Sequence, residues 1–276
     1  MTYLIIATYI IDCILICTRP WKYFQINSRF FNEKEGIFSK IEIDDLIPEK
    51  WRLSQQCDDG HSIPERFPVF IKPEWGQNAN GIFRADNTEE LTIVRQITKE
   101  AQIKYLIQLG ATEKLEFEIF WILHDQNPQQ FANLTVTQAI NHSEKNPVNG
   151  VNNPNTVYRD ISEQFDEQQK QILWNLLGEI ERFGISRVAL RADSIADLLA
   201  GRFHIIEINL FIPMPINILD AKNDFFSEWK LVRIYMKSLA RITKARNRAL
   251  KEKAVFTKIM LYDRRSPMLN YIRNRL

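Results

Sequence analysis

The chain has 276 residues, 45% of them apolar, and a formal net charge of +2. This composition excludes an intrinsically disordered chain, and the length allows one large hydrophobic core or two smaller ones. So small a net charge excludes a strong electrostatic field over the whole surface, of the kind used to bind nucleic acid. The three cysteines (Cys13, Cys17 and Cys57) have neither a disulfide nor a zinc-site spacing, so we expect a reducing compartment.

Residues 3–17 are almost continuously apolar. The segment has no basic residue ahead of it and no small-residue cleavage site, so it does not resemble a signal peptide. It is shorter than the ~20 residues of a membrane-spanning helix, and it contains Asp12. If it did insert, Arg19 and Lys22 behind it would keep the following chain in the cytoplasm. Two interpretations stay open: a packed or interfacial helix, and a membrane anchor.

The middle of the chain alternates between predicted strands and helices. A polar stretch with Gly and Pro at residues 57–64 predicts a boundary near residue 60. The expected elements that follow are a strand at 66–73 ending near Lys72, a loop between Gly76 and Gly81, a helix from Asn87 to about Lys99, strands at 103–109, 114–124 and 131–139, an Asn- and Pro-rich loop at 142–156, and a helix at 165–183.

Residues 187–211 predict a strand, a turn and a second strand. Because side chains two residues apart share a face of a strand, Arg191 lies with Asp193, and Glu207 lies with Asn209. Carboxylate and amide oxygens are suited to Mg²⁺ that also binds substrate phosphates. The alternative is a solvated sheet face with a surface ion pair, which adds little stability. The apolar neighbours of Glu207 favour the metal-site interpretation, because a carboxylate is costly to bury without a partner.

The end of the chain, residues 223–276, is rich in Lys and Arg. Apolar residues at helical spacing between Phe225 and Leu239 predict a helix there, with the basic residues largely off the apolar stripe. Together with residues 3–17, this extension favours a membrane surface as a partner, since each Lys or Arg near anionic lipid adds roughly 1 kcal/mol. The alternative is a solvated helix face. Nucleic acid is not expected as a partner, because the basic residues lack the interleaved aromatic residues of a stacking platform.

The order of a lysine, a glycine loop, an acidic strand and a hairpin with Asp, Glu and Asn resembles the ATP-grasp superfamily, and its D-alanine–D-alanine ligase-like branch most closely. The resemblance covers about residues 67–217. It implies an α+β fold in which two subdomains clasp ATP, here with an apolar N-terminal helix, a basic helical C-terminal extension and no βαβ domain of the usual kind at the N-terminus. The expected segments are 1–60 (apolar helix and connection), 61–112 (small lid subdomain), 113–222 (large subdomain with the Mg²⁺ site) and 223–276 (extension).

The resemblance also implies roles for individual residues. The expected ATP-binding residues are Lys72 on the phosphates, Gly76, Asn80 and Gly81 in the lid loop, Gln108 and Leu109 at the adenine hinge, Glu116 on the ribose (with Glu118 as the alternative), and Lys40 as a second lysine (with Lys34 as the alternative). Asp193, Glu207 and Asn209 are expected to hold two Mg²⁺ ions. Arg191 is the expected catalytic residue, stabilising charge on the transferred phosphoryl group.

The implied reaction is the ATP-dependent joining of a small-molecule carboxylate to an amine, or to a thiol, through an acyl phosphate. A kinase, or a membrane-surface ATP-binding module without turnover, is the alternative. The turn after Asn209 lacks the glycine typical of dipeptide ligases, which argues against D-alanine as substrate. The loop at 142–156 is the expected specificity element. The expected location is the cytoplasm, with association to the inner face of a membrane as the alternative.

Overall fold

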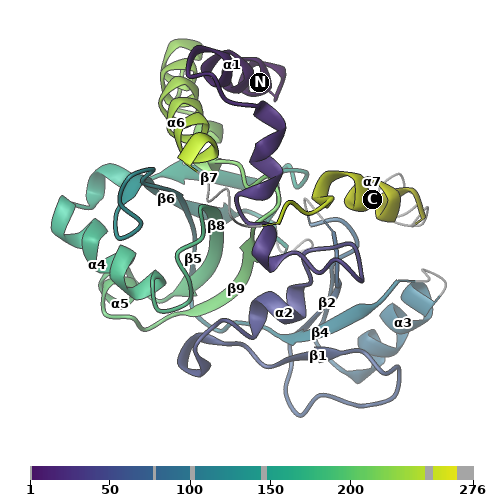
Figure 1. Cartoon of the computed structure of the whole chain (residues 1–276). Helices are drawn as coiled ribbons and strands as arrows, with labels where there is room; N and C mark the ends of the chain where they lie inside the picture. The colour runs from purple at the N-terminus through teal and green to yellow at the C-terminus, as the bar shows by residue number, and fades with distance from the viewer. Residues whose placement is uncertain (1, 77–78, 100–102, 144–147, 246–250, 266–276) are drawn as a thin grey trace.

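The computed structural model describes residues 2–76, 79–99, 103–143, 148–245 and 251–265. Its centre consists of two antiparallel sheets with helices around them (Figure 1). The smaller sheet has the strand order β1-β4-β2-β3, and the larger sheet has the order β7-β6-β5-β8-β9. The structure therefore confirms the α+β class expected from the sequence, and two sheets facing one another can enclose a cleft.

The larger sheet consists of β5 (Leu115–Leu123), β6 (Phe131–Asn141), β7 (Thr156–Asp160), β8 (Ile185–Ala192) and β9 (His204–Asn209). Alternation along β5 buries Phe117, Ile119 and Trp121 in the main core, where α4 (Glu167–Leu177) and α5 (Ile195–Leu199) also pack. The Trp121 indole donates a hydrogen bond to the Phe183 carbonyl at 3.0 Å. The polar residues of β5 and β8 therefore share the opposite face of the sheet, toward the smaller one.

The smaller sheet consists of β1 (Gln55–Cys57), β2 (Val69–Pro73), β3 (Phe83–Ala85) and β4 (Tyr105–Leu109), and α3 (Thr88–Thr98) packs against it. Asn87 caps α3 by accepting a hydrogen bond from the Glu90 N–H at 2.9 Å, so the helix begins where the sequence predicted. Strand β1 pairs with β4 although it precedes residue 60. The segment expected as an N-terminal connection thus supplies one edge of the smaller sheet.

The connection between α1 and the smaller sheet contains η1 (Pro20–Gln25), η2 (Ser28–Phe30), α2 (Lys40–Asp44) and η3 (Glu49–Trp51). Phe31, Ile37 and Trp51 from this stretch are buried in the main core. Ser39 caps α2 by accepting from the Glu42 N–H, which fixes Lys40 in the first turn of that helix. The connection is therefore folded onto both sheets, and it places Lys40 between them.

Two predicted boundaries differ from the structure. Helix α4 ends at Leu177 instead of continuing to residue 183; Gly178 is its C-cap residue, and the Gly178 N–H donates to the Trp174 carbonyl at 3.0 Å. The predicted turn between β8 and β9 contains the short helix α5, which begins where the Ser194 side chain accepts from the Asp197 N–H at 3.0 Å. The two strands are still neighbours, but the connection is longer than a hairpin turn.

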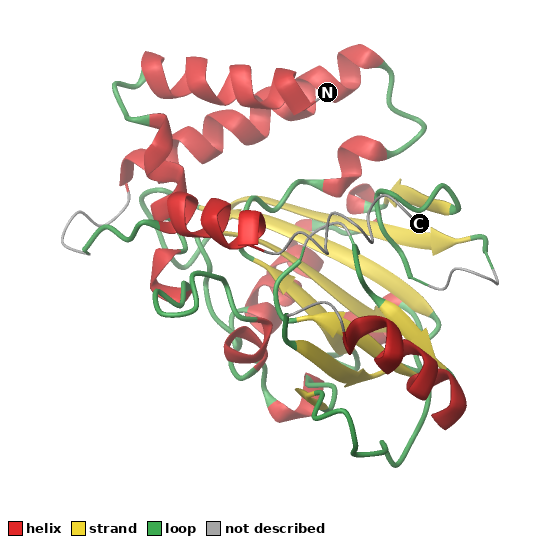
Figure 2. Ribbon diagram, turned by 90° about the vertical axis from the view of Figure 1, so that its right-hand side faces the viewer, coloured by secondary structure: helices red, strands yellow, loops and turns green. Residues whose placement is uncertain are grey.

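The remaining helices are η5 (Ser162–Gln164), η6 (Ile216–Leu219), α1 (Thr2–Leu15), α6 (Phe225–Ala245) and α7 (Val255–Arg265). Val232, Met236 and Leu239 of α6 pack against Phe120 and Ile122 of β5. Helix α1 lies beside α6 at the edge of the molecule (Figure 2). None of the helices among the described residues combines the length and apolarity needed to cross a bilayer.

Candidate functional site

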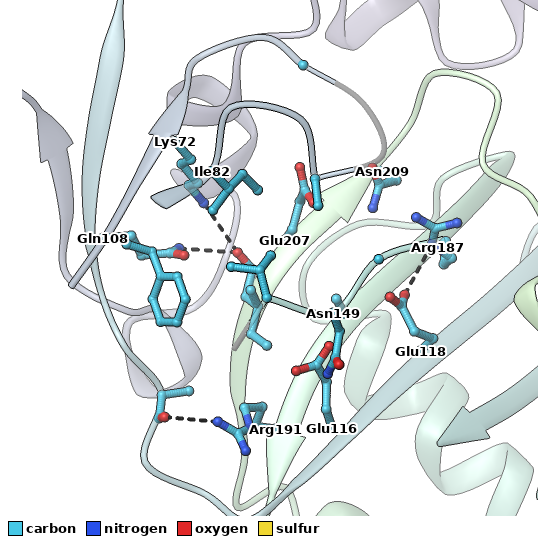
Figure 3. A pocket seen from close by; sticks show the side chains of 18 of the residues that line it. Lys72, Ile82, Gln108, Glu116, Glu118, Asn149, Arg187, Arg191, Glu207 and Asn209 are labelled. Atoms are coloured by element: carbon cyan, nitrogen blue, oxygen red, sulfur yellow. Dashed lines mark hydrogen bonds and ion pairs between the residues drawn. The ribbon is translucent and has the colours of Figure 1, made fainter. Parts of the chain in front are cut away.

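A cleft opens between the two sheets (Figure 3). Its walls come from β2 and β4 on one side, from β5, β8 and β9 on the other, and from α2 and two loops at the rim. The predicted site residues that line it are Lys40, Lys72, Gly76, Asn80, Gln108, Leu109, Glu116, Arg191, Glu207 and Asn209. Gly81 and Asp193 are outside the lining. The structure therefore brings most of the expected side chains to one place.

Two lysines that line the cleft converge on one carboxylate. Lys72, on β2, is 5% exposed, and its Nζ donates to the Ile206 carbonyl at 3.4 Å. The Nζ of Lys40 is 3.4 Å from Glu207 Oε1 and 3.1 Å from the Pro73 carbonyl. Lys34, the alternative second lysine, is exposed, and its backbone N–H donates to the Asn32 side chain instead. Lys40 is thus the lysine that faces the cleft with Lys72.

The charges around this carboxylate are strongly coupled. Burial lowers the pKa of Lys72 to about 8, partly opposed by the negative charge of Glu207. Burial alone would raise the pKa of Glu207, but Lys40, Lys72 and Arg187 together lower it below its ordinary value. Burial raises the pKa of Asp44, behind Lys72, to about 6. A buried ammonium with a depressed pKa gains most from an anionic ligand, because a negative group restores its protonated form.

Pairing of β8 with β9 decides which side chains meet across the larger sheet. Ala189 is opposite Glu207, and Arg187 is opposite Asn209. A register shift next to Ala189 gives β9 an extra residue, and β8 ends before Asp193. Asp193 instead accepts a hydrogen bond from the Lys114 N–H at 3.2 Å. Of the three expected oxygen donors, Glu207 and Asn209 therefore line the cleft, whereas Asp193 lies outside its lining.

A second carboxylate faces the cleft from β5. Ala189 of β8 has two neighbours across the sheet, Glu118 of β5 on one side and Glu207 of β9 on the other. The three residues form a row across three strands, in which the alanine separates two acids. Burial raises the pKa of Glu118, opposed by Arg187, whose Nε lies 3.1 Å from Glu118 Oε2. The described residues contain no group of three His, Cys, Asp or Glu side chains that could hold a metal. Two carboxylates and an amide nevertheless suit Mg²⁺, which binds mainly to water and substrate phosphates.

The two arginines of β8 have different surroundings. The Arg191 guanidinium donates to the carbonyls of Ala111 (3.4 Å) and Lys114 (3.2 Å), so it holds the segment that joins the two sheets. Arg187 lies between Glu118 and the β9 strand that bears Asn209 (Figure 3). Sequence reasoning missed Arg187, although it shares the polar face of β8 with Arg191 at period two. It is the arginine nearest the candidate metal ligands.

Backbone groups at the predicted adenine hinge, Gln108 and Leu109, already form hydrogen bonds within the smaller sheet. The Leu109 N–H donates to the Ser54 carbonyl at 2.9 Å, and the Gly110 N–H donates to the Pro68 carbonyl at 2.8 Å. The Gln108 side chain donates to the Ile206 carbonyl at 3.2 Å and so joins the two sheets. Ala111, the next residue along, lines the cleft. Ala111, beyond the residues the sequence suggested, is thus also part of the cleft wall, and its carbonyl accepts from Arg191.

Glu116 lies two residues before Glu118 on β5, opposite Arg191. Burial and the nearby Glu118 raise its pKa to about 7, while Asn149 and Arg191 oppose the shift. Asn149 belongs to the stretch 148–151, which lines the cleft and is part of the predicted specificity loop at 142–156; residues 144–147 of that loop lie outside the description. Glu116 can thus accept hydrogen bonds from a hydroxyl-bearing ligand near physiological pH.

The lid loop of the sequence prediction lies over the side of the cleft formed by the smaller sheet. Gly76, Ala79 and Asn80 line the cavity, whereas Gly81 takes a left-handed conformation (φ +73°) that turns the chain into β3. Residues 77–78 lie outside the description. Backbone at such a loop can approach phosphate oxygens closely, as glycine-rich loops do.

No family model and no curated protein matches the sequence. Solved structures similar to the chain include the D-Ala:D-Ser ligase VanG from Enterococcus faecalis, with 12% identity and a TM-score of 0.48 over 79% of this chain and 70% of that one. A D-alanine–D-alanine ligase from Bacillus anthracis complexed with ATP has 14% identity and a TM-score of 0.46, over 76% and 68%. Each of these likenesses has a TM-score below 0.5.

An L-amino acid ligase from Bacillus licheniformis is also similar, with 14% identity and a TM-score of 0.45 over 76% of this chain. The chain spans half the length of that enzyme. Identities this low carry no information on substrate or mechanism. What the chain does has to follow from the side chains of its own cleft.

Proposed function

We propose that the chain is an ATP-dependent ligase that activates a small-molecule carboxylate as an acyl phosphate. The observation that carries this proposal is the convergence of Lys40 and Lys72 on Glu207 inside the cleft. Two cations held in a largely water-excluded site match a polyphosphate, since each can form charge-assisted hydrogen bonds to phosphate oxygens. Glu207 interacts with both lysines, and Asp44 interacts with Lys72 from behind. The pKa of Lys72 is nevertheless depressed, so an anionic ligand would stabilise its protonated form.

The other cleft residues fit the remaining parts of a nucleotide. Glu116 would accept from the ribose hydroxyls, and Ala111 would offer its backbone to the adenine edge. Glu207 and Asn209, with Glu118 across Ala189, would hold Mg²⁺, which when bound neutralises charge on the phosphate oxygens. Arg187, beside this row, would stabilise the charge that develops on the transferred phosphoryl group.

The reaction has two steps. An oxygen of the substrate carboxylate attacks the γ-phosphorus of ATP, and the bond to the β,γ-bridging oxygen breaks to release ADP. The nitrogen of an amine then attacks the acyl carbon, phosphate leaves, and the amine loses a proton. The partly buried stretch at 148–151 and Tyr158 of β7 line the cleft and would border the acyl substrate.

Calorimetric titration of ATP with Mg²⁺ tests the nucleotide part of this proposal. Lys72→Met and Lys40→Met are each expected to weaken binding roughly 10- to 100-fold, because each removes a hydrogen bond between charged groups. Lys34→Met is the matched control and is expected to leave the affinity unchanged, because Lys34 is exposed outside the cleft. Equal affinities for all three variants and the wild type would refute the site.

A screen for ADP release with paired carboxylates and amines tests the proposed ligase reaction. A phosphorylated product without condensation would make the protein a kinase.

The affinity for ATP is also expected to depend on pH through Lys72. Its pKa in the free protein is about 8, so the ammonium is present below that pH and is lost above it. ATP affinity should then fall by about tenfold per pH unit on the alkaline side, until the pKa of the complex is reached. Lys72→Arg keeps its charge at these pH values and should bind without this alkaline loss. The same alkaline limb in both proteins would assign it to another group.

A further inference from the structure

Helix α1 presents an apolar face to solvent instead of burying it. Ile5, Tyr9 and Cys13 face inward, and Ile5 and Tyr9 pack against the cluster that contains α6. The outward face carries large apolar side chains that are 38–89% exposed, which we call the apolar ridge: Tyr3, Ile6, Ile10, Ile11, Ile14 and Leu15. Folding does not require such a ridge, since its side chains contribute nothing to the core.

The neighbouring helix α6 carries a row of cations on its own outward face. The row, which we call the cationic stripe, has a helical spacing of three or four residues and consists of Lys230, Arg233, Lys237, Arg241 and Lys244, all exposed. The only acid within α6 is Glu228. Positive charge on one face of an amphipathic helix, without interleaved acids, is typical of a surface that meets negative charge.

The helix that carries the stripe lies directly against the helix that carries the ridge. Arg233 lies 3.7 Å from Asp12 of α1, and the Lys244 ammonium donates to the Ile16 carbonyl, just after α1, at 2.7 Å. Both views show the two helices side by side at the edge of the molecule (Figures 1 and 2). At the end of α1, Trp21 is 61% exposed, and the Arg19 guanidinium lies 5.9 Å from the centre of its ring. Exposed tryptophan beside arginine is typical of the membrane–water interface.

We propose that this surface docks the protein onto an anionic lipid bilayer, with α1 lying in the plane of the interface. A bilayer matches both parts of the surface, because acyl chains accept the ridge while anionic headgroups pair with the stripe. A second copy of the chain fits less well, because symmetric contact would bring two cationic stripes together with few acids to oppose them. Nucleic acid would pair with the stripe but would leave the isoleucines of the ridge in water.

Flotation with phosphatidylcholine vesicles, with and without phosphatidylserine, tests this docking with the full chain. Wild type is expected to float with the anionic vesicles and to remain in solution with the neutral ones. The stripe variant Lys230→Gln/Lys237→Gln/Arg241→Gln is expected to lose on the order of 100-fold in partition coefficient, at about 1 kcal/mol per cation. The ridge variant Ile6→Gln/Ile10→Gln/Ile14→Gln should lose a similar factor, because it removes the apolar area that enters the interface.

The matched control is Arg66→Gln/Arg84→Gln/Lys99→Gln, which removes the same charge from exposed positions on or near the smaller sheet and should float like the wild type. Equal flotation of all proteins, or none with anionic vesicles, would overturn the proposal. A dimer in solution that the ridge variant abolishes would assign the surface to a second copy instead. ATP binding in the absence of vesicles should be unchanged in the stripe and ridge variants, which separates this test from that of the cleft.

Discussion

Glu207→Gln is expected to weaken the binding of ATP with Mg²⁺ by about 100-fold, while Asp193→Asn is expected to change it less than about twofold. Glu207 faces the cleft between Lys40 and the Ala189 position, so its carboxylate is available to a cation held by phosphates. Asp193 lies past the end of β8 and accepts from a backbone N–H there. Calorimetry on both variants measures the difference. A larger loss in Asp193→Asn than in Glu207→Gln would restore the arrangement first expected from the sequence.

The same pair of variants distinguishes a metal ligand from a residue that merely supports the fold. Without Mg²⁺, Glu207→Gln should bind ATP more tightly than the wild type, because Lys40 and Lys72 lose an internal anion that competes with phosphate. The measurement is made below pH 8, since loss of Glu207 also lowers the pKa of Lys72. A loss of affinity that is equal with and without Mg²⁺ would contradict the metal role. Matching thermal unfolding curves would show that the variant is folded.

Much of the fold was predictable because its signals are local. The alternation of apolar and polar residues identified β2, β4, β5 and β6, and Asn87 with Glu90 marked the start of α3. Strand β1 gave no such signal: Gln55–Cys57 has no apolar residue to bury and is held by pairing with β4. An edge strand of this kind depends on a partner that is far away in sequence.

For the candidate site, the sequence predicted only which face of a strand each side chain lies on. The alternation of side chains along a strand correctly predicted that Glu207 and Asn209 share a face. It does not determine which residues of β8 lie opposite them. That choice depends on the register shift beside Ala189 and on the insertion of α5 between the strands. For the same reason Arg187 was missed, since on β8 alone it is indistinguishable from Arg191.

The electrostatic coupling of charged groups in the cleft also could not be predicted from the sequence. Lys40, Lys72 and Glu207 come from three elements, and their proximity needs both sheets and α2 in place. The row of Glu118, Ala189 and Glu207 likewise spans β5, β8 and β9. Chemistry that depends on side chains from several strands cannot be derived from the spacing within any one of them.

The two arginines of β8 lead to the second large expected effect. Arg187→Ala is expected to lower kcat for ADP release by about 10²- to 10³-fold, as the loss of one group that stabilises transition-state charge does. Arg191→Ala should change kcat by less than about tenfold, because its guanidinium lies on the segment that joins the two sheets, opposite Glu116, whereas the Arg187 guanidinium lies beside Glu118. The assay uses the carboxylate and amine found in the ADP-release screen. Each Kd for ATP is measured alongside kcat.

Comparing the effect of each substitution on kcat with its effect on the Kd for ATP shows whether Arg187 acts in the transition state. A group that acts mainly in the transition state changes kcat far more than ground-state binding, so Arg187→Ala should keep most of its affinity for ATP. Arg187→Lys should recover only part of the rate, because an ammonium cannot reproduce two parallel hydrogen bonds. Glu118→Gln removes the partner that holds Arg187 at 3.1 Å and should lower kcat less than Arg187→Ala, since the guanidinium itself remains. If Arg191→Ala lost as much kcat as Arg187→Ala, the catalytic arginine would be the one that joins the two sheets, and the pairing of Arg187 with Glu118 would be structural.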